Sequence, residues 1–587
     1  MDEPNRAEPH RTGASRAEPN RTGVDRRGLF AAAGALAAGG TVTALAAGGT
    51  AGAATAAGTA RPAGPVSVRP ADARYGSLLR GDNWRFVGRP DEICVAASTE
   101  EVVHAVSGAV RTGRRLAVRS GGHCFEGFTA DPAVRLLLDL SPMNGVGYDG
   151  ERGAFVVGPG ATLGQVYRTL FTRWGVTIPA GGCPEVGAGG HFCGGGYGPL
   201  SRRYGSVVDH LHGVEVVVVD GDGTVRTVVA TRDPDDPHHD LWWAHTGGGG
   251  GNFGVVTKYW LRAPGATGSD PSRLLPAAPA RLLECVVGWA WDERMTEKAF
   301  TGLLRNFGVW HEQHSAAGSP QANLYAILQA AHRSAGSFRM IVQIDADVPG
   351  ANDLVTGFVS AVTAGTGAEP AVDARRTVPW LHPITWPGAG EAGDVITRRY
   401  KIKAAYLRRS FTGPQLTTVY RHLTNSTGTP DGSLELIGYG GQVNTVRPTA
   451  TAVAQRDAVM KADFHTVWAD ATDDAAGLAW VRDFYRDVYR DTGGVPVPGR
   501  TSDGSYINYP DTDLADPAWN TSGVPWHTLY YKGNYPRLQR VKSRWDPRDV
   551  FCHALAIEPP KARPPRRADD PATATPFSSR PVVDPGR

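Results

Sequence analysis

Two glycine loops in this chain each carry a nucleophilic side chain. Residues 119–123 read Arg-Ser-Gly-Gly-His and end at His123, and residues 181–184 read Gly-Gly-Cys-Pro and contain Cys183. Small residues let main-chain N–H groups approach a diphosphate closely, and an imidazole or thiol beside such a loop can bond covalently to an isoalloxazine ring. The two loops therefore predict a double attachment of one flavin.

A metal site is the alternative chemistry for the same cysteines and histidines. Cys183, His191 and Cys193 lie close together in the chain. They lack a convincing fourth ligand and a recognised zinc spacing, so we predict no metal.

Three segments carry a resemblance to a known family. They are residues 119–127 (RSGGHCFEG), 183–198 (CPEVGAGGHFCGGGYG) and 247–254 (GGGGGNFG). Together they resemble the berberine bridge enzyme-like flavoproteins of the vanillyl-alcohol oxidase superfamily. The resemblance implies FAD as cofactor, attached at its 8α position through His123 and at C6 through Cys183. It also implies an α+β fold, in which a two-part PCMH-type FAD-binding domain holds an inserted sheet-plus-helix substrate domain.

The resemblance assigns further residues to the cofactor. Those expected to bind the pyrophosphate are Arg119, Ser120, Gly121, Gly122, Gly187, Gly189 and Gly190. Asn534 would hydrogen-bond the flavin ring. Val186 stands three positions after the attachment cysteine, where valine accompanies oxidase behaviour in plant relatives and leucine accompanies dehydrogenase behaviour. A short side chain there leaves room for O2, so we expect H2O2 as co-product.

A tyrosine is the expected catalytic base. Oxidation of an alcohol by flavin needs a group that accepts the hydroxyl proton, and tyrosine can do this if its pKa is lowered. Tyr506 and Asn508 match the Tyr-x-Asn segment of the family's bacterial sugar and glycoside oxidases. Tyr197 and Tyr439 match tyrosines near the flavin or substrate in relatives, although a packing role is an equal alternative for Tyr197, and Tyr439 could simply support the sheet.

The first loop should lie at the end of a strand. Residues 92–97 read as a strand, 99–112 as a helix with apolar spacing, and 116–118 as a second strand that ends at the loop. Residues 214–219 and 225–230 predict a hairpin around an Asp-Gly-Asp-Gly turn.

Residues 249–254 match the dinucleotide pattern GxGxxG, but that motif needs a strand before it and a helix after it. Here a predicted helix at 240–245 precedes the glycines and a β-rich run at 255–260 follows them. We therefore reject a nicotinamide site of the Rossmann type.

The rest of the chain predicts three further parts. The flavin domain would span 66–262, the substrate domain 263–490, and residues 491–560 would return to the flavin domain by resemblance. Within the substrate domain we expect strands at 324–328 and 338–344 and a helix at 451–462.

The ends of the chain and its composition set limits. Residues 1–60 read as an export leader of the twin-arginine type, with Arg26-Arg27 before an Ala/Gly-rich stretch, and 561–587 as a disordered tail. No segment reaches membrane-spanning length, so we expect no membrane association of the mature protein. The 61 basic and 58 acidic residues give a net charge of +3, which offers no reason for a nucleic-acid partner. Six cysteines are too few for a disulfide-built scaffold, although one or two bridges are open.

We therefore predict an exported FAD-dependent oxidase that takes hydride from a hydroxyl-bearing carbon of a sugar, glycoside or related natural product. O2 would reoxidise the flavin. The alternatives are an oxidative cyclase or dehydrogenase of secondary metabolism on the same fold, and a flavin-carrying binding protein without turnover.

Overall fold

The computed structural model describes residues 64–382, 398–426 and 432–560. The predicted export leader at 1–60 and the predicted tail at 561–587 lie outside the described residues. The fold below belongs to the compact unit Pro62–Arg587.

A small sheet carries the first glycine loop at the end of one of its strands. Its strand order is β1 (Val66–Val68), β2 (Glu92–Val95), β4 (Leu136–Asp139) and β3 (Leu116–Arg119), with β2, β4 and β3 parallel. Helix α2 (Thr99–Thr112) begins after Ser98, whose hydroxyl accepts from the Glu101 N–H, and ends at Gly113 in the left-handed conformation. The predicted strand, helix and strand are confirmed, and β3 ends where the glycines begin.

A second sheet has five antiparallel strands. Their order is β5 (Val146–Asp149), β6 (Ala154–Val157), β9 (Val255–Leu261), β7 (Leu211–Val219) and β8 (Val225–Thr231). The β7–β8 hairpin is confirmed. Helix α6 (His239–Ala244) precedes the 247–254 glycines and β9 follows them, so the order that argued against a Rossmann site is also confirmed. The other helices of this region are α1 (Tyr75–Leu78), α3 (Leu163–Trp174), α4 (Ala188–Cys193) and α5 (Ser201–Tyr204).

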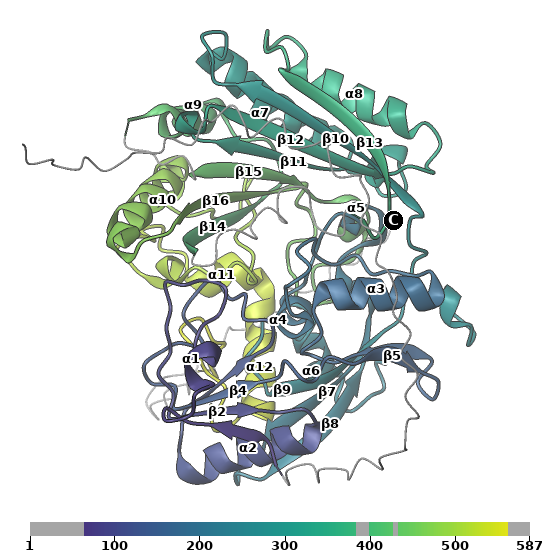
Figure 1. Cartoon of the computed structure of the whole chain (residues 1–587), viewed down its shortest axis with the longest axis vertical. Coiled ribbons are helices and arrows are strands. Elements are labelled where there is room, and N and C mark those ends of the chain that lie inside the picture. The colour runs from purple at the N-terminus through teal and green to yellow at the C-terminus, as the bar shows by residue number, and fades with distance from the viewer. Residues whose placement is uncertain (1–63, 383–397, 427–431, 561–587) are drawn as a thin grey trace, which may run out of the picture. The chain divides into compact units, whose positions relative to one another are not determined.

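The third sheet has seven strands and is antiparallel throughout. In order they are β13 (Val372–Pro379), β10 (Arg281–Ala290), β12 (Ser337–Asp345), β11 (Tyr325–Ala331), β15 (Ser433–Gly438), β16 (Met460–Trp468) and β14 (Arg399–Leu407). Helices α7 (Glu297–Gln313), α8 (Ala351–Thr363), α9 (Gly413–Thr424) and α10 (Asp474–Val488) cover one of its faces (Figure 1). The predicted strands at 324–328 and 338–344 are confirmed as β11 and β12.

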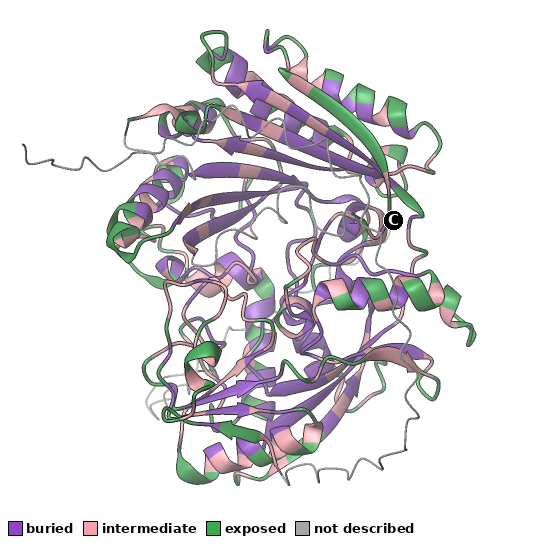
Figure 2. Ribbon diagram, viewed as in Figure 1, coloured by how far each residue is buried: buried purple, intermediate pink, exposed green. Residues whose placement is uncertain are grey.

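Burial follows this arrangement. Figure 2 shows buried residues along the inner strands, while the covering helices are buried on one side and exposed on the other. The edge strand β13 is mostly exposed, whereas β14, at the other edge of the same sheet, is mostly buried. One face of the seven-stranded sheet is therefore left to pack against, or open toward, the flavin-binding region.

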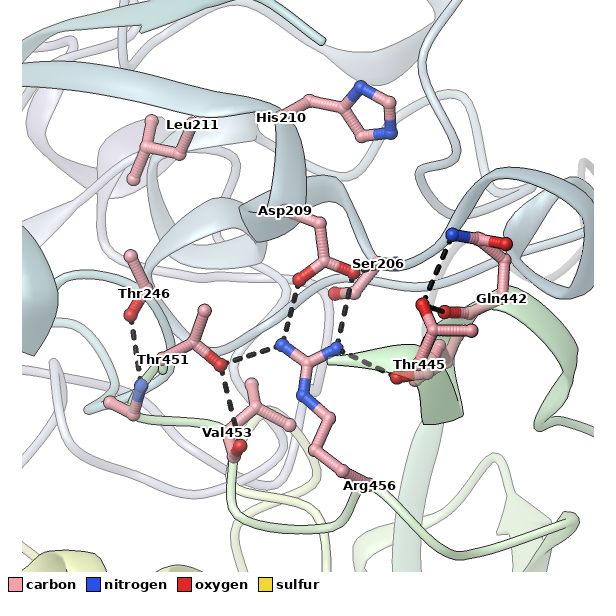
Figure 3. A network of polar contacts seen from close by, with 12 residues as sticks. Ser206, Asp209, His210, Leu211, Thr246, Gln442, Thr445, Thr451, Val453 and Arg456 are labelled. Carbon is pink, nitrogen blue, oxygen red and sulfur yellow. Dashed lines mark hydrogen bonds and ion pairs between the residues drawn. The ribbon is translucent and has the colours of Figure 1, made fainter. Parts of the chain in front are cut away.

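The predicted helix at 451–462 is wrong. Residues 451–459 form an irregular buried stretch, and Met460 begins strand β16. Arg456 from this stretch forms a buried ion pair with Asp209, and its Nη2 atom also donates to the Thr451 hydroxyl at 2.6 Å (Figure 3). Satisfying a buried guanidinium outweighs the apolar spacing that suggested a helix.

The C-terminal segment packs back onto the flavin-binding region. Helices α11 (Trp526–Tyr531) and α12 (Tyr535–Trp545) follow one another, and α12 contacts α6. Lys542 of α12 is fully buried, where its ammonium donates to the carbonyl of Asn252 at 2.9 Å and pairs with Asp546. A buried charge that is paired and hydrogen-bonded holds the segment to the glycine-rich 247–254 turn.

Among the described residues, no helix is long and apolar enough to cross a membrane. All six cysteines lie in the described part of the chain, and none of them is bonded to another.

Candidate active site

A cavity of about 570 Å³ separates the glycine loops from the open face of the seven-stranded sheet. His123, Cys183, Val186 and Tyr506 lie in its wall. The sheet contributes alternate residues of four strands, as expected for side chains that point to one face. These are Tyr325, Ile327, Tyr400, Ile402, Glu435, Ile437, Asp463, His465 and Val467.

The two attachment loops contact each other through their backbones. A Cβ atom added to Gly121 would lie 2.3 Å from the Gly187 nitrogen, so neither position can carry a side chain without moving the other loop. At Gly190 and Gly250, both in the cavity wall, an added Cβ would meet nothing within 4 Å. Bare backbone that faces open space is the kind of cradle that the diphosphate of FAD needs. The wall residues therefore fit this cofactor.

His123 is the predicted nucleophile of the first loop. Its side chain is 18% exposed, and its Nδ1 atom lies 3.9 Å from a carboxylate oxygen of Asp82. Burial lowers the pKa of His123, although the Asp82 charge opposes this effect. The imidazole is therefore held neutral, which is the form that can attack an electrophilic carbon.

Cys183 lies in the same cavity wall. Burial raises the pKa of its thiol to about 11, and the Glu185 carboxylate, whose Oε2 atom accepts from the Cys183 thiol at 3.5 Å, adds to the rise. The thiol form of Cys183 is thus favoured in this structure.

Two predicted phosphate ligands use their side chains elsewhere. The Arg119 guanidinium pairs with Asp139 at 2.5 Å and donates to the Leu78 carbonyl, and the Ser120 hydroxyl donates to the Pro159 carbonyl at 2.6 Å. Because both side chains are already satisfied within the protein, their backbone N–H groups are what remain for the predicted contact with the pyrophosphate. Both residues still line the cavity, as do Gly121, Gly122, Gly187, Gly189 and Gly190.

Tyr506 lies in the wall of the same cavity. Its hydroxyl accepts a hydrogen bond from the Asn508 amide at 3.0 Å and donates to the Gly195 carbonyl at 3.2 Å. The Tyr197 ring lies 5.4 Å from the Tyr506 ring in an edge-to-face arrangement. The structure thus brings Tyr506, Asn508 and Tyr197 together, as the sequence predicted.

Burial raises the pKa of Tyr506, and the Asn508 hydrogen bond opposes this only in part. The lowered pKa expected for a base is therefore not provided by the residues that the sequence had identified. A group that stabilises the phenolate is needed.

Lys461 lies beside both tyrosine rings, and sequence reasoning missed it. Its ammonium nitrogen lies 3.2 Å from the centre of the Tyr197 ring and 3.4 Å from that of Tyr506. Within the described chain this nitrogen is buried and has no hydrogen-bond partner. Burial lowers the pKa of Lys461, whereas the faces of the aromatic rings favour its charged form.

A carboxylate pair lies beside Lys461 on the same sheet. Asp463 is opposite Glu435 in the register of β16 and β15, and both line the cavity. Asp463 is 5% exposed, and its Oδ1 atom has no hydrogen-bond partner among the described residues. Burial and the neighbouring Glu435 raise the pKa of Asp463. The sheet thus presents polar groups toward the space where a substrate would lie.

Two predicted site residues do not line the cavity. Tyr439 is fully buried behind Tyr197, 5.6 Å from its ring, and burial raises its pKa to about 12. Asn534 donates through its amide to the carbonyls of Pro448, Thr451 and Ala452. The predicted contact of Asn534 with the flavin ring is wrong, because its amide instead fixes the irregular stretch before β16.

The sequence did contain a signal for the missed residues. From Met460 to His465 apolar and polar residues alternate, which is typical of a half-buried strand, and Lys461, Asp463 and His465 share one face of it. The erroneous helix at 451–462 hid this alternation. The described residues contain no cluster of histidine, cysteine and acidic side chains that could hold a metal ion.

Two family models match this chain. The FAD binding domain model covers residues 90–228, and the berberine and berberine-like model covers residues 505–558. The first region contains both glycine loops, and the second contains Tyr506 and Asn508.

Known proteins match over most of the chain. Aclacinomycin-N/aclacinomycin-A oxidase of Streptomyces galilaeus is 55% identical over 496 residues, 84% of this chain and 90% of that protein. The chain belongs to the berberine bridge enzyme-like FAD-linked oxidases. Hexose oxidase of Chondrus crispus is a second relative of this chain. It is 31% identical over 83% of this chain and 93% of the hexose oxidase. The crystal structure of a glycopeptide hexose oxidase complexed with teicoplanin is 51% identical, covers 85% of this chain and 100% of its own, and has a TM-score of 0.80.

This berberine bridge enzyme-like oxidase therefore binds FAD on a PCMH-type fold, as the resemblance implied. The structure also shows which side chains line the cavity and which instead form hydrogen bonds or ion pairs within the surrounding protein.

Proposed function

We propose that this oxidase removes hydride from a hydroxyl-bearing carbon of a sugar, a glycoside or a related glycosylated natural product. The observation that carries the proposal is that Tyr506, with Lys461 against its ring, lines the same cavity as His123 and Cys183. A group that can accept a proton therefore shares this cavity with the loops expected to bind the flavin. The names of relatives, an aclacinomycin oxidase and two hexose oxidases, support the substrate class.

The side chains have separate roles in this proposal. FAD, when bound, accepts the hydride. Tyr506 takes the hydroxyl proton of the substrate, Asn508 holds the Tyr506 oxygen by its hydrogen bond, and Lys461 stabilises the phenolate through the ring face. Asp463 and Glu435 offer acceptors for further substrate hydroxyls, as the unpartnered Asp463 oxygen suggests.

A screen of donors tests the substrate class. Purified protein is mixed anaerobically with hexoses, oligosaccharides and glycosylated aromatic natural products, and flavin bleaching is followed at its visible absorption band. At least one glycosylated donor should bleach the flavin in a single turnover. Bleaching only by donors that have no sugar would overturn the substrate class while leaving the enzyme class intact.

We further propose that the flavin is bonded to both His123 and Cys183. Two facts support this: both side chains lie in one cavity wall, and His123 is held in its neutral, nucleophilic form. Acid-precipitated wild-type protein should stay yellow, and mass spectrometry should find flavin mass on both peptides. His123→Ala and Cys183→Ala should each lose one bond and keep the other. Complete release of the colour into the supernatant would refute covalent attachment.

O2 is the proposed electron acceptor, with H2O2 as co-product. Val186 in the cavity wall supports this, since its side chain is smaller than the leucine that accompanies dehydrogenase behaviour in plant relatives. Peroxide released in proportion to the donor consumed is the expected result.

Export by the twin-arginine route remains a proposal that rests on Arg26 and Arg27 ahead of an apolar, Ala/Gly-rich stretch. Replacing both arginines by lysine should retain the protein inside the cell. Equal export of the wild-type and variant chains would contradict this route.

A further inference from the structure

Asp82 lies where three segments of the chain meet at the first attachment loop. The Asp82 N–H donates to the Gly122 carbonyl at 2.9 Å, and a Cβ atom on Gly81 would lie 2.4 Å from that same oxygen. Residues 81 and 82 therefore pack directly on the loop that carries His123. This contact sets the Asp82 carboxylate beside the imidazole, 3.9 Å from Nδ1.

The carboxylate itself is held by the start of strand β14. Arg398 donates to both of its oxygens, at 2.9 and 3.0 Å, and the Tyr400 hydroxyl donates to Oδ2 at 2.9 Å. The Asn83 amide next to it bonds to the carbonyls of Phe125 and Tyr400. The sheet on the far side of the cavity thus fixes the position of a carboxylate that faces His123.

Asp82 differs from the other acidic residues of the cavity in its contact with His123. Within the described ranges, no other acidic side chain lies as close to a His123 ring nitrogen as Asp82 does, while Glu185 contacts Cys183 and Asp463 lies beside Lys461. Asp82 and His123 are both mostly buried and both line the cavity. A partly buried carboxylate interacts more strongly with a charge that develops nearby than it would in water.

We propose that Asp82 is a positioning residue for covalent attachment through His123, orienting the imidazole and stabilising the positive charge that the ring acquires as it forms its bond to the flavin. The inference rests on the proposed double attachment. A carboxylate close to a histidine favours the positively charged form of the ring.

The bond-forming step balances without a further reagent. The flavin 8α methyl group loses a proton, a lone pair of the His123 ring forms the new carbon–nitrogen bond, and the imidazole gives up its N–H proton. The electron pair of the broken carbon–hydrogen bond remains on the flavin, which is thereby reduced by two electrons. O2, the acceptor in the proposed reaction, then takes these two electrons with two protons and becomes H2O2.

The test compares the two attachment peptides in one protein. Asp82→Asn keeps the shape of the side chain and removes its charge, and Asp82→Glu restores the charge. Asp91→Asn is the matched control, because Asp91 pairs with Arg135 on the surface, where both side chains are about half exposed. Each protein is purified with its flavin and digested, and the fractions of the His123 and Cys183 peptides that carry flavin mass are measured.

In Asp82→Asn, the ratio of His123-linked to Cys183-linked flavin should fall about tenfold or more, as is typical when the carboxylate partner of a histidine is removed. The bond between Cys183 and the flavin should persist, which would show that the site of this variant is still folded. In Asp82→Glu, the ratio of His123-linked to Cys183-linked flavin should return most of the way to its wild-type value. Asp91→Asn should match the wild type.

Two results would overturn the inference: an unchanged ratio in Asp82→Asn, or equal loss of both bonds. Failure of the underlying proposal looks different, since the wild-type His123 peptide would then carry no flavin at all.

Discussion

The ammonium nitrogen of Lys461 lies 3.4 Å from the centre of the Tyr506 ring. The two residues come from different parts of the chain, Lys461 from strand β16 and Tyr506 from the segment matched by the berberine-like model. Their contact joins a buried positive charge to the proposed base. We make four predictions, which concern this contact, Val186 in the cavity wall and the buried ion pair of Arg456.

Tyr506→Phe removes the hydroxyl while keeping the ring over Lys461. The rate of flavin reduction by a donor should fall about 100-fold or more, which is the contribution expected of a positioned base. Anaerobic stopped-flow absorption measures this rate. Tyr148→Phe, which removes a hydroxyl that bonds only to the Ser269 carbonyl, serves as control. A rate within threefold of wild type, roughly 0.65 kcal/mol of barrier, would exclude Tyr506 as the base.

Lys461→Met removes the charge and keeps a chain of similar length. Burial raises the pKa of Tyr506. We expect a charged Lys461 ammonium against the ring to oppose that rise, so that without it the phenolate becomes harder to form. The acid limb of the profile of flavin-reduction rate against pH should therefore move to higher pH, by about one unit. Lys298→Met, on the exposed side of α7, should leave the profile in place. An acid limb that stays at its wild-type pH would argue against this role.

Val186→Leu adds volume to the cavity wall next to the attachment cysteine. Reoxidation of the reduced flavin by O2 should slow about tenfold or more, which corresponds to 1.4 kcal/mol of barrier, because less space is left for O2. Flavin reduction by the donor should change little. Stopped-flow mixing of reduced protein with O2 separates the two half-reactions, and Val186→Ala should reoxidise at least as fast as wild type. Equal reoxidation by the leucine variant would remove the steric explanation.

Arg456→Met breaks the buried ion pair that anchors the stretch before β16 (Figure 3). It leaves the Asp209 carboxylate buried without its partner, which costs about 3–5 kcal/mol of stability. The thermal midpoint, measured at equal flavin content, should fall clearly. Arg135→Met, at the exposed pair with Asp91, should cost less than about 1 kcal/mol. The double variant Asp209→Asn/Arg456→Met should be less harmful than Arg456→Met alone; if it is worse, the buried charge is not the cause.

Local order was predictable where local patterns decide it. The strand, helix and strand before the first glycine loop, the β7–β8 hairpin, and the helix-then-strand order around residues 249–254 all follow from spacing, caps and turn residues. The helix at 451–462 failed because the buried pair of Arg456 with Asp209 joins residues far apart in the chain. No local window contains that information.

By itself, the sequence determined that two nucleophile-bearing glycine loops and a Tyr-x-Asn segment belong to one FAD enzyme, because these motifs are short and their chemistry depends on residue type. Only the tertiary structure decided that Lys461 lies beneath Tyr506, that Asp82 faces His123, and that Tyr439 and Asn534 lie away from the cavity. Each of these relationships brings together residues from distant segments. These relationships depend on the register of the seven-stranded sheet and on how the C-terminal segment packs against the rest of the fold. Neither feature can be read from nearest neighbours in the chain.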